Sequence, residues 1–171
     1  MAAAADAPRE AVENDDVATF TARFASGALG TFSCSRVAFG MPNDKALSVM
    51  GSEGTAMWSL ARTGEIRIAD SSSPTGLGGL RQVLASPEFP YFRGGSSMAF
   101  AGVGLNQIEQ FTYQAHAFIQ QVAGITEGAL PANATFADGY REMLLADAVA
   151  RSAAAGGAAV DISDLPELAS L

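Results

Sequence analysis

Two positively charged side chains stand at the ends of expected strands, where they could hold a polar or anionic ligand. Arg36 lies near the end of a strand expected over residues 28–38, and its planar guanidinium could bind a carboxylate there. A structural salt bridge is the alternative for Arg36. Lys45, the only lysine, opens a later strand directly after a loop that includes Asn43. Lys45 is therefore either a solvated charge at a strand end or a cation beside a ligand.

A second group of candidate contacts lies in an irregular segment further along the chain. Residues 90–95 join two aromatic rings, one of them Tyr91, and an arginine, Arg93, to a pair of glycines. Aromatic rings and guanidinium groups are typical of surfaces that contact sugars or other proteins. The alternative is a loop that its own aromatic side chains hold in place.

The sequence contains no constellation typical of a catalytic or metal site. His116 is the only histidine, and no Asp, Glu or Cys lies at metal-ligand spacing from it, so a zinc site is not expected. A general base needs a partner within hydrogen-bond reach, and a lone helical histidine is more often packed or capping. We predict no catalytic residue and no metal ligand, which makes an independent hydrolase or lyase the weakest hypothesis.

Gly102 and Gly104 begin like the fingerprint of a dinucleotide-binding loop. The third position of that fingerprint is Gln107 instead of glycine, and no buried parallel strand precedes the run. We therefore expect a loop that leads into a helix, and no cofactor bound by this chain.

Apolar periodicity predicts strands first and helices afterwards. Ala18, Phe20, Ala22 and Phe24 alternate with more polar residues, as on a strand with one apolar face, and a turn after them leads into the strand over 28–38. Further strands are expected over residues 46–50, 55–60, 65–70, 80–85 and 159–162.

The second half of the chain has a helical period. Apolar residues three or four positions apart predict an amphipathic helix over about 105–123. Asn133 to Thr135 provides the N-terminal cap of a second helix, which ends near Ser152. Strands followed by helices indicate an α+β fold: an open, mostly antiparallel sheet of about five to six strands with two helices packed on one face.

The sheet face opposite the helices is half apolar, and we expect it to support a homo-oligomer. The residues assigned to this open face are Val17, Leu29, Val37, Leu47 and Val49, beside Thr19, Thr31 and Ser33.

Composition argues against several partners and locations. Ten Lys and Arg against eighteen Asp and Glu give a net charge of −8, which disfavours nucleic acid and an anionic membrane surface. Cys34 is the only cysteine, so no internal disulfide can form, as is usual in a reducing compartment. No apolar run approaches the roughly 20 residues that span a bilayer, and no signal peptide is recognised, so we expect a cytoplasmic protein.

We predict one domain over 13–162, between a disordered leader at 1–12 and a loose tail at 163–171.

Several short segments, taken in order, carry a family resemblance. They are Asp15–Phe20, Phe24–Gly30, Ser35–Ala38, Val49–Ala56, Phe111–Phe118, Pro131–Ala132, Phe136–Arg141 and the Ser152–Gly157 region. In order and spacing they resemble the C-terminal domain of the Gfo/Idh/MocA oxidoreductases over about residues 13–162.

This resemblance implies an open antiparallel sheet that completes a substrate pocket and builds dimers or tetramers. In full-length members an N-terminal Rossmann half binds NAD(P), and sugars, inositols and related polyols are oxidised by hydride transfer. The loops that approach the substrate in such enzymes correspond here to Arg36 with the loop to Asn43, and to Tyr91 and Arg93. We therefore predict these four residues as substrate-binding.

The sequence departs from the family pattern in its catalytic parts. The Rossmann half is absent, Lys45 is not part of a Glu-Lys-Pro motif because Ala46 follows it, and Thr112 stands where an Asp-x-x-x-His motif ending at His116 would have aspartate. We expect the substrate-pocket and oligomerisation domain of an NAD(P)-dependent sugar or polyol oxidoreductase, inactive alone and dependent on a separate nucleotide-binding domain or subunit. The alternative is a standalone binding or scaffold module that uses the sheet face for a partner or small polar ligand.

Overall fold

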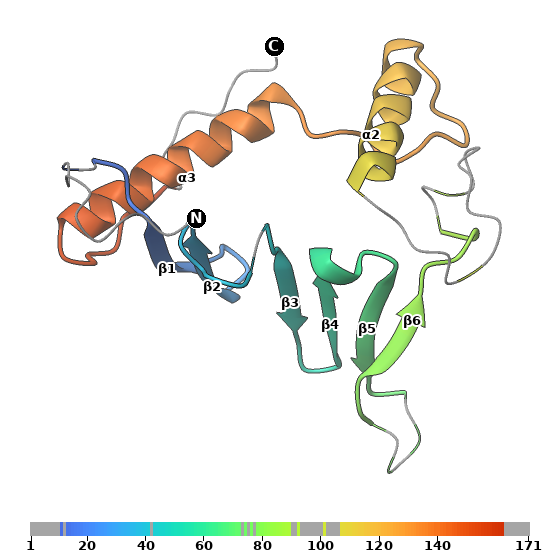
Figure 1. Cartoon of the computed structure of the whole chain (residues 1–171), viewed down its shortest axis with the longest axis horizontal. Helices are drawn as coiled ribbons and strands as arrows, with labels where there is room; N and C mark the ends of the chain where they lie inside the picture. The colour runs from blue at the N-terminus through green and yellow to red at the C-terminus, as the bar shows by residue number, and fades with distance from the viewer. Residues whose placement is uncertain are drawn as a thin grey trace. The chain divides into compact units, whose positions relative to one another are not determined.

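A computed structural model describes residues 11, 13–41, 43–72, 74, 76, 78–89, 92, 101 and 107–162 (Figure 1). The described residues form, in chain order, β1 (Val17–Arg23), β2 (Leu29–Ser35), β3 (Ala46–Met50), β4 (Gly54–Ser59), the short 3-10 helix η1 (Leu60–Arg62), β5 (Glu65–Asp70), β6 (Arg81–Leu84), α2 (Gln107–Val122) and α3 (Phe136–Ala154). The chain divides into two compact units, one reaching to Pro42 and including Val149–Val160, the other running from Asn43 to Ala148. The predicted leader and tail lie outside the described residues, except for residue 11.

The first unit contains an antiparallel hairpin of β1 and β2. Phe20 pairs with Phe32 across the two strands, and their rings stack with centroids 4.7 Å apart. Exposure alternates along β1, with Ala18, Phe20 and Ala22 half-buried between exposed neighbours. The predicted apolar face of this strand is therefore confirmed. Gly27 has φ 89° in the turn between the strands, a conformation that glycine adopts without steric cost.

The second unit contains a four-stranded antiparallel sheet in the order β3-β4-β5-β6 (Figure 1). Leu47 lies opposite Trp58, and Ala56 lies opposite Ile68, so these side chains share one face of the sheet. Position 54 leaves no room for a side chain beside β5, because a Cβ atom there would be 2.6 Å from the backbone oxygen of Ala69.

Two helices follow the strands. Tyr113 and Ala117 on α2 are buried, as is Leu130 in the loop after the helix. Thr135 caps α3, because its hydroxyl accepts a hydrogen bond from the Asp138 N–H at 3.3 Å while the Asp138 carboxylate accepts one from the Thr135 N–H at 2.8 Å. This reciprocal pair satisfies backbone donors that the first turn of a helix leaves free.

The α+β class, the antiparallel pairing and both helices are confirmed, with three differences in detail. The six described strands form two open sheets of two and four strands instead of one continuous sheet. The strand expected over 159–162 is absent, since these described residues have no ladder partner. The cap of the second helix is Thr135, whereas Asn133 bonds elsewhere. No helix within the described ranges combines the length and apolar character needed to cross a membrane.

Candidate functional site

An open cavity of about 620 Å³ lies in the second unit and is lined by residues of the four-stranded sheet and of α2. We call it the Lys45 cavity. Its described lining residues are Lys45, Trp58, Leu60, Thr63, Phe92, Gln110, Phe111, Tyr113, Gln114 and Asn133.

The sheet contributes a cation and an aromatic ring to the cavity through the pleat of its strands. The Leu60 N–H donates a hydrogen bond of 2.8 Å to the Lys45 carbonyl, which extends the β3–β4 pairing by one step beyond Ala46 and Ser59. Because successive side chains of a strand point to opposite faces, Trp58 and Leu60 lie on the same face, together with Lys45 across from Leu60. The end of the sheet thus places an ammonium group beside an indole ring.

Helix α2 contributes amide and phenol groups from one of its faces. Gln110, Tyr113 and Gln114 are separated by three and four residues, the spacing that aligns side chains along one side of a helix. Tyr113 is the buried member, and its ring packs edge-on against Phe92 with centroids 5.4 Å apart. Both glutamines line the cavity beside this anchored ring.

The loop after α2 is held against the helix by side-chain amides. The Asn133 Nδ2 donates to the Gln114 carbonyl at 3.0 Å, and the Asn133 N–H donates to the Gln121 Oε1 at 3.1 Å. From the neighbouring position on the helix, the Gln120 Oε1 accepts a hydrogen bond from the Leu130 N–H at 2.9 Å. These bonds fix Asn133 at the rim of the Lys45 cavity.

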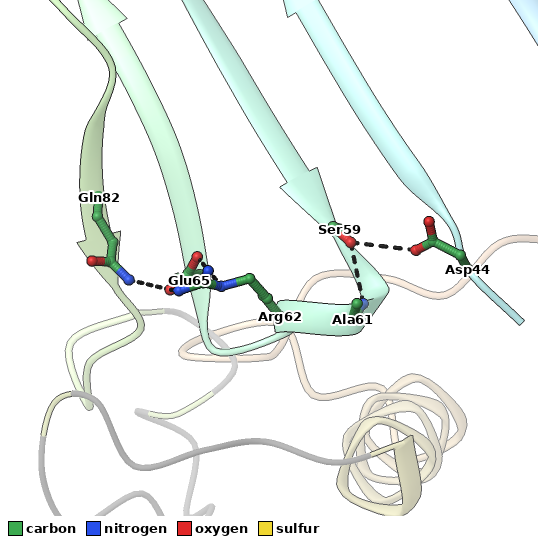
Figure 2. Close-up of polar contacts among 6 residues, drawn as sticks. All are labelled: Asp44, Ser59, Ala61, Arg62, Glu65 and Gln82. Carbon is green, nitrogen blue, oxygen red and sulfur yellow. Dashed lines mark hydrogen bonds and ion pairs between the residues drawn. The ribbon is translucent and has the colours of Figure 1, made fainter. Parts of the chain in front are cut away.

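Acidic groups near the sheet end have partners of their own. The Asp44 Oδ1 accepts a hydrogen bond from the Ser59 hydroxyl at 3.4 Å (Figure 2). The Glu65 carboxylate binds the Arg62 guanidinium through both oxygens, at 2.6 and 3.0 Å, and also accepts a hydrogen bond from Gln82 (Figure 2). Among the described residues, none of these carboxylates pairs with Lys45.

The described lining of the Lys45 cavity can bind polar ligands. Its described lining includes one cation, three side-chain amides, hydroxyl groups and aromatic rings, and it includes no Asp, Glu, His or Cys. General acid–base catalysis by a carboxylate or imidazole therefore has no donor in this lining. No cluster of three metal-ligand side chains occurs among the described residues.

Comparison with known proteins finds a similarity to one family. The family model for the GFO/IDH/MocA C-terminal domain matches residues 1–57. Levoglucosan dehydrogenase of Pseudarthrobacter phenanthrenivorans is 32% identical over 149 residues, which cover 87% of this chain and 37% of that enzyme. The chain is therefore similar to the C-terminal part of GFO/IDH/MocA proteins. It spans little more than a third of the length of this relative.

Solved structures extend the match to the three-dimensional fold. Levoglucosan dehydrogenase in complex with NADH and levoglucosan has a TM-score of 0.75 and 32% identity, covering 84% of this chain and 37% of the other. The oxidoreductase domain protein from Kribbella flavida has a TM-score of 0.73 and 31% identity, covering 89% and 38% respectively. The structural similarity therefore extends over most of the chain.

The structure describes two of the four residues predicted to bind substrate. Arg36 follows β2 directly; its N–H donates to the Asp16 carbonyl at 2.8 Å, and its side chain is exposed. Asn43 is exposed and has φ 51°, a left-handed conformation. Neither lines the Lys45 cavity, while Tyr91 and Arg93 lie outside the described residues. Their role in binding stays a prediction.

The structure also describes two further residues singled out in the sequence. His116 is half-buried, and its Nε2 lies 3.3 Å from the Gln120 Nε2 on the same helix. Lys45 lines the cavity, and its role beside a ligand stays a prediction.

The remaining cavity residues were missed. Trp58 comes from β4, whereas Gln110 and Gln114 both come from α2, and only the spacing of the two glutamines carries a local signal. Their meeting depends on how α2 packs against the end of the sheet.

Proposed function

We infer that this chain is the substrate-side domain of an NAD-dependent sugar oxidoreductase. The observation that carries the proposal is its 32% identity to levoglucosan dehydrogenase over 87% of the chain. That relative has been solved with NADH and levoglucosan and with NADH and L-sorbose, and this domain matches both structures with TM-scores of 0.75 and 0.76. The proposed substrates are accordingly sugars or related polyols, and the proposed location is the cytoplasm.

The described residues of this chain do not fit a nicotinamide cofactor by themselves. Dinucleotides bind at the carboxyl ends of parallel strands, where a glycine-rich turn leads into a helix. Every strand pair described here is antiparallel. NAD is therefore proposed to be held by a separate nucleotide-binding domain or subunit, and this domain contributes the surroundings of the substrate.

A second role proposed for the domain is self-association. Val17 and Leu29 are 53% and 65% exposed, and both lie on the face of the β1–β2 hairpin opposite the Phe20–Phe32 stack. Leu47 and Val49 on β3 are also more than half exposed, but Leu47 shares its sheet face with Trp58, which lines the Lys45 cavity together with α2. Exposed apolar side chains on open strands favour a contact with a second copy.

A chimeric enzyme tests the catalytic proposal. The 149-residue matching segment of the Pseudarthrobacter enzyme would be replaced by this chain, leaving that enzyme's remaining part unchanged. We expect NAD-dependent oxidation of at least one compound in a panel of sugars and polyols, followed by the absorbance of NADH. The matched control is the same enzyme with the segment deleted.

NADH binding separates a wrong proposal from a misfolded chimera. A chimera that binds NADH, unfolds cooperatively and oxidises nothing in the panel would overturn the proposal. A standalone binding module, the second candidate, would instead show a sugar-dependent rise in the melting temperature of this chain alone while the chimera stays inactive.

A further inference from the structure

The Lys45 cavity contains a cation that the described protein does not neutralise. Lys45 is the only lysine of a chain with net charge −8, so a free ammonium group is exceptional on this surface. The carboxylate next to it in sequence, Asp44, accepts its hydrogen bond from Ser59. Pleat alternation directs Asp44 and Lys45 to opposite faces of the sheet. Within the described part of the chain, Lys45 has no ion pair.

The walls around this cation suit a polyol. Trp58 offers an aromatic face against which the C–H groups of a sugar ring can pack, and Gln110, Gln114 and Asn133 offer amides that can donate to and accept from hydroxyl groups. The Asn133 Nδ2 is already bonded to the Gln114 carbonyl, which fixes that amide in one orientation. The cavity volume of about 620 Å³ lies within the roughly 300–1,000 Å³ typical of small-molecule sites.

The charge of the lining selects among polyols. Its described residues include one ammonium and no carboxylate, so a cationic ligand would meet repulsion without compensation. An anionic group would form a charge-assisted hydrogen bond with Lys45, which contributes more than a bond between neutral groups. The ligand would also displace water from the indole and phenol rings, and burying this apolar surface contributes favourably to the free energy of binding.

We propose that the Lys45 cavity binds a monosaccharide-sized polyol bearing a carboxylate or phosphate, with Lys45 pairing to the anion and Trp58 packing on the sugar ring. The choice of a sugar rests on the proposed function, whereas the choice of an anion rests on the cavity itself. The substrate class of the oxidoreductase is thereby narrowed to sugar acids or sugar phosphates.

The test is a titration of the whole chain, without NAD, with glucuronate, glucose 6-phosphate and glucose as sodium salts or in matched sodium chloride. Trp58 is the only tryptophan, so its fluorescence reports on this cavity. We expect at least one of the two anionic sugars to bind roughly 10- to 100-fold more tightly than glucose, the ratio that corresponds to one charge-assisted hydrogen bond. Which of the two binds more tightly identifies the anion as carboxylate or phosphate.

Two variants with the same change of charge show whether Lys45 is responsible. Lys45→Gln should abolish the preference for the anionic sugars over glucose. Arg23→Gln removes a positive charge from β1, outside the cavity lining, and should keep the preference. Melting temperatures of both variants confirm that they are folded.

A second signal covers the case in which bound sugar leaves the fluorescence unchanged. Selective labelling of lysine with ¹⁵N gives one side-chain signal, because the chain has one lysine. Equal affinity for charged and neutral sugars, a preference that survives Lys45→Gln, or no saturable change in either signal overturns the proposal. These outcomes do not depend on the chimeric enzyme, so each proposal can fail without the other.

Discussion

At the scale of single residues, the cap of α3 couples stability to pH. The Asp138 pKa is lowered below its ordinary 3.8, chiefly because its carboxylate accepts a hydrogen bond from the Thr135 N–H, and further because of the Thr135 hydroxyl and the nearby Arg141. A carboxyl group whose pKa is lower in the folded state stabilises the fold above its unfolded pKa. That contribution is lost as the pH falls below 3.8 through the folded pKa.

The Asp138→Asn variant should therefore be less stable than the parent chain at neutral pH. The difference in the free energy of unfolding between the two should shrink progressively below pH 3.8, because the protonated carboxyl and the amide then carry the same charge. Urea unfolding at a series of pH values, followed by circular dichroism, measures this difference. A difference that stays constant down to the lowest pH would mean that the amide perturbs packing and that the charge of Asp138 contributes nothing.

At the scale of the elements, replacing a glycine by alanine should have opposite effects on stability at two positions. Gly54→Ala places a Cβ atom 2.6 Å from the Ala69 backbone oxygen, and the β4–β5 ladder limits how far either strand can move. We expect a loss of about 1–3 kcal/mol in the free energy of unfolding. In Gly139→Ala the new Cβ has no neighbour within 4 Å, so α3 should gain about 0.5–1 kcal/mol.

Denaturant midpoints of the two variants and the parent chain, measured together, check both signs. Gly30→Ala provides an intermediate case, since its Cβ would be 2.8 Å from a ring atom of Phe32 that can rotate away. A stable Gly54→Ala variant would show that β4 can separate from β5 without loss.

The strands and helices could be predicted because their signals are local. Alternation at Ala18, Phe20 and Ala22 reports a half-buried strand, and spacing of three and four reports α2. The split into two sheets could not be predicted, because strand pairing depends on contacts distant in sequence. The prediction of a strand over 159–162 was wrong for the same reason, because an apolar run alone does not supply a partner for its backbone groups.

At the scale of the whole molecule, the family could be predicted and the candidate site mostly could not. The order of short segments is a property of the sequence, and the comparison with levoglucosan dehydrogenase confirms it. The Lys45 cavity joins residues 45 and 58 of the sheet to residues 110–114 of α2, which meet only after packing. Arg36 was chosen from its place at a strand end and from the resemblance, and Asn43 from the resemblance, and neither kind of information fixes which residues share a cavity.

Self-association is the remaining property of the whole molecule, and Leu29 offers the sharpest test of it. Leu29 pairs with Arg23 at the end of the β1–β2 hairpin and is 65% exposed. It lies on the hairpin face opposite the Phe20–Phe32 stack, where a contact with a second copy would bury it. Leu29→Lys would place a charge in that contact. Burying an unpaired charge is strongly unfavourable, so the variant should weaken association. We expect the parent chain to elute as an oligomer and the variant to shift towards the monomer, measured by light scattering at matched concentrations.

Phe39→Lys makes the same change of charge at a fully exposed residue between the strands, and it should leave the mass unchanged. A monomeric parent chain, or equal masses for all three proteins, would mean that the hairpin face does not hold two copies together.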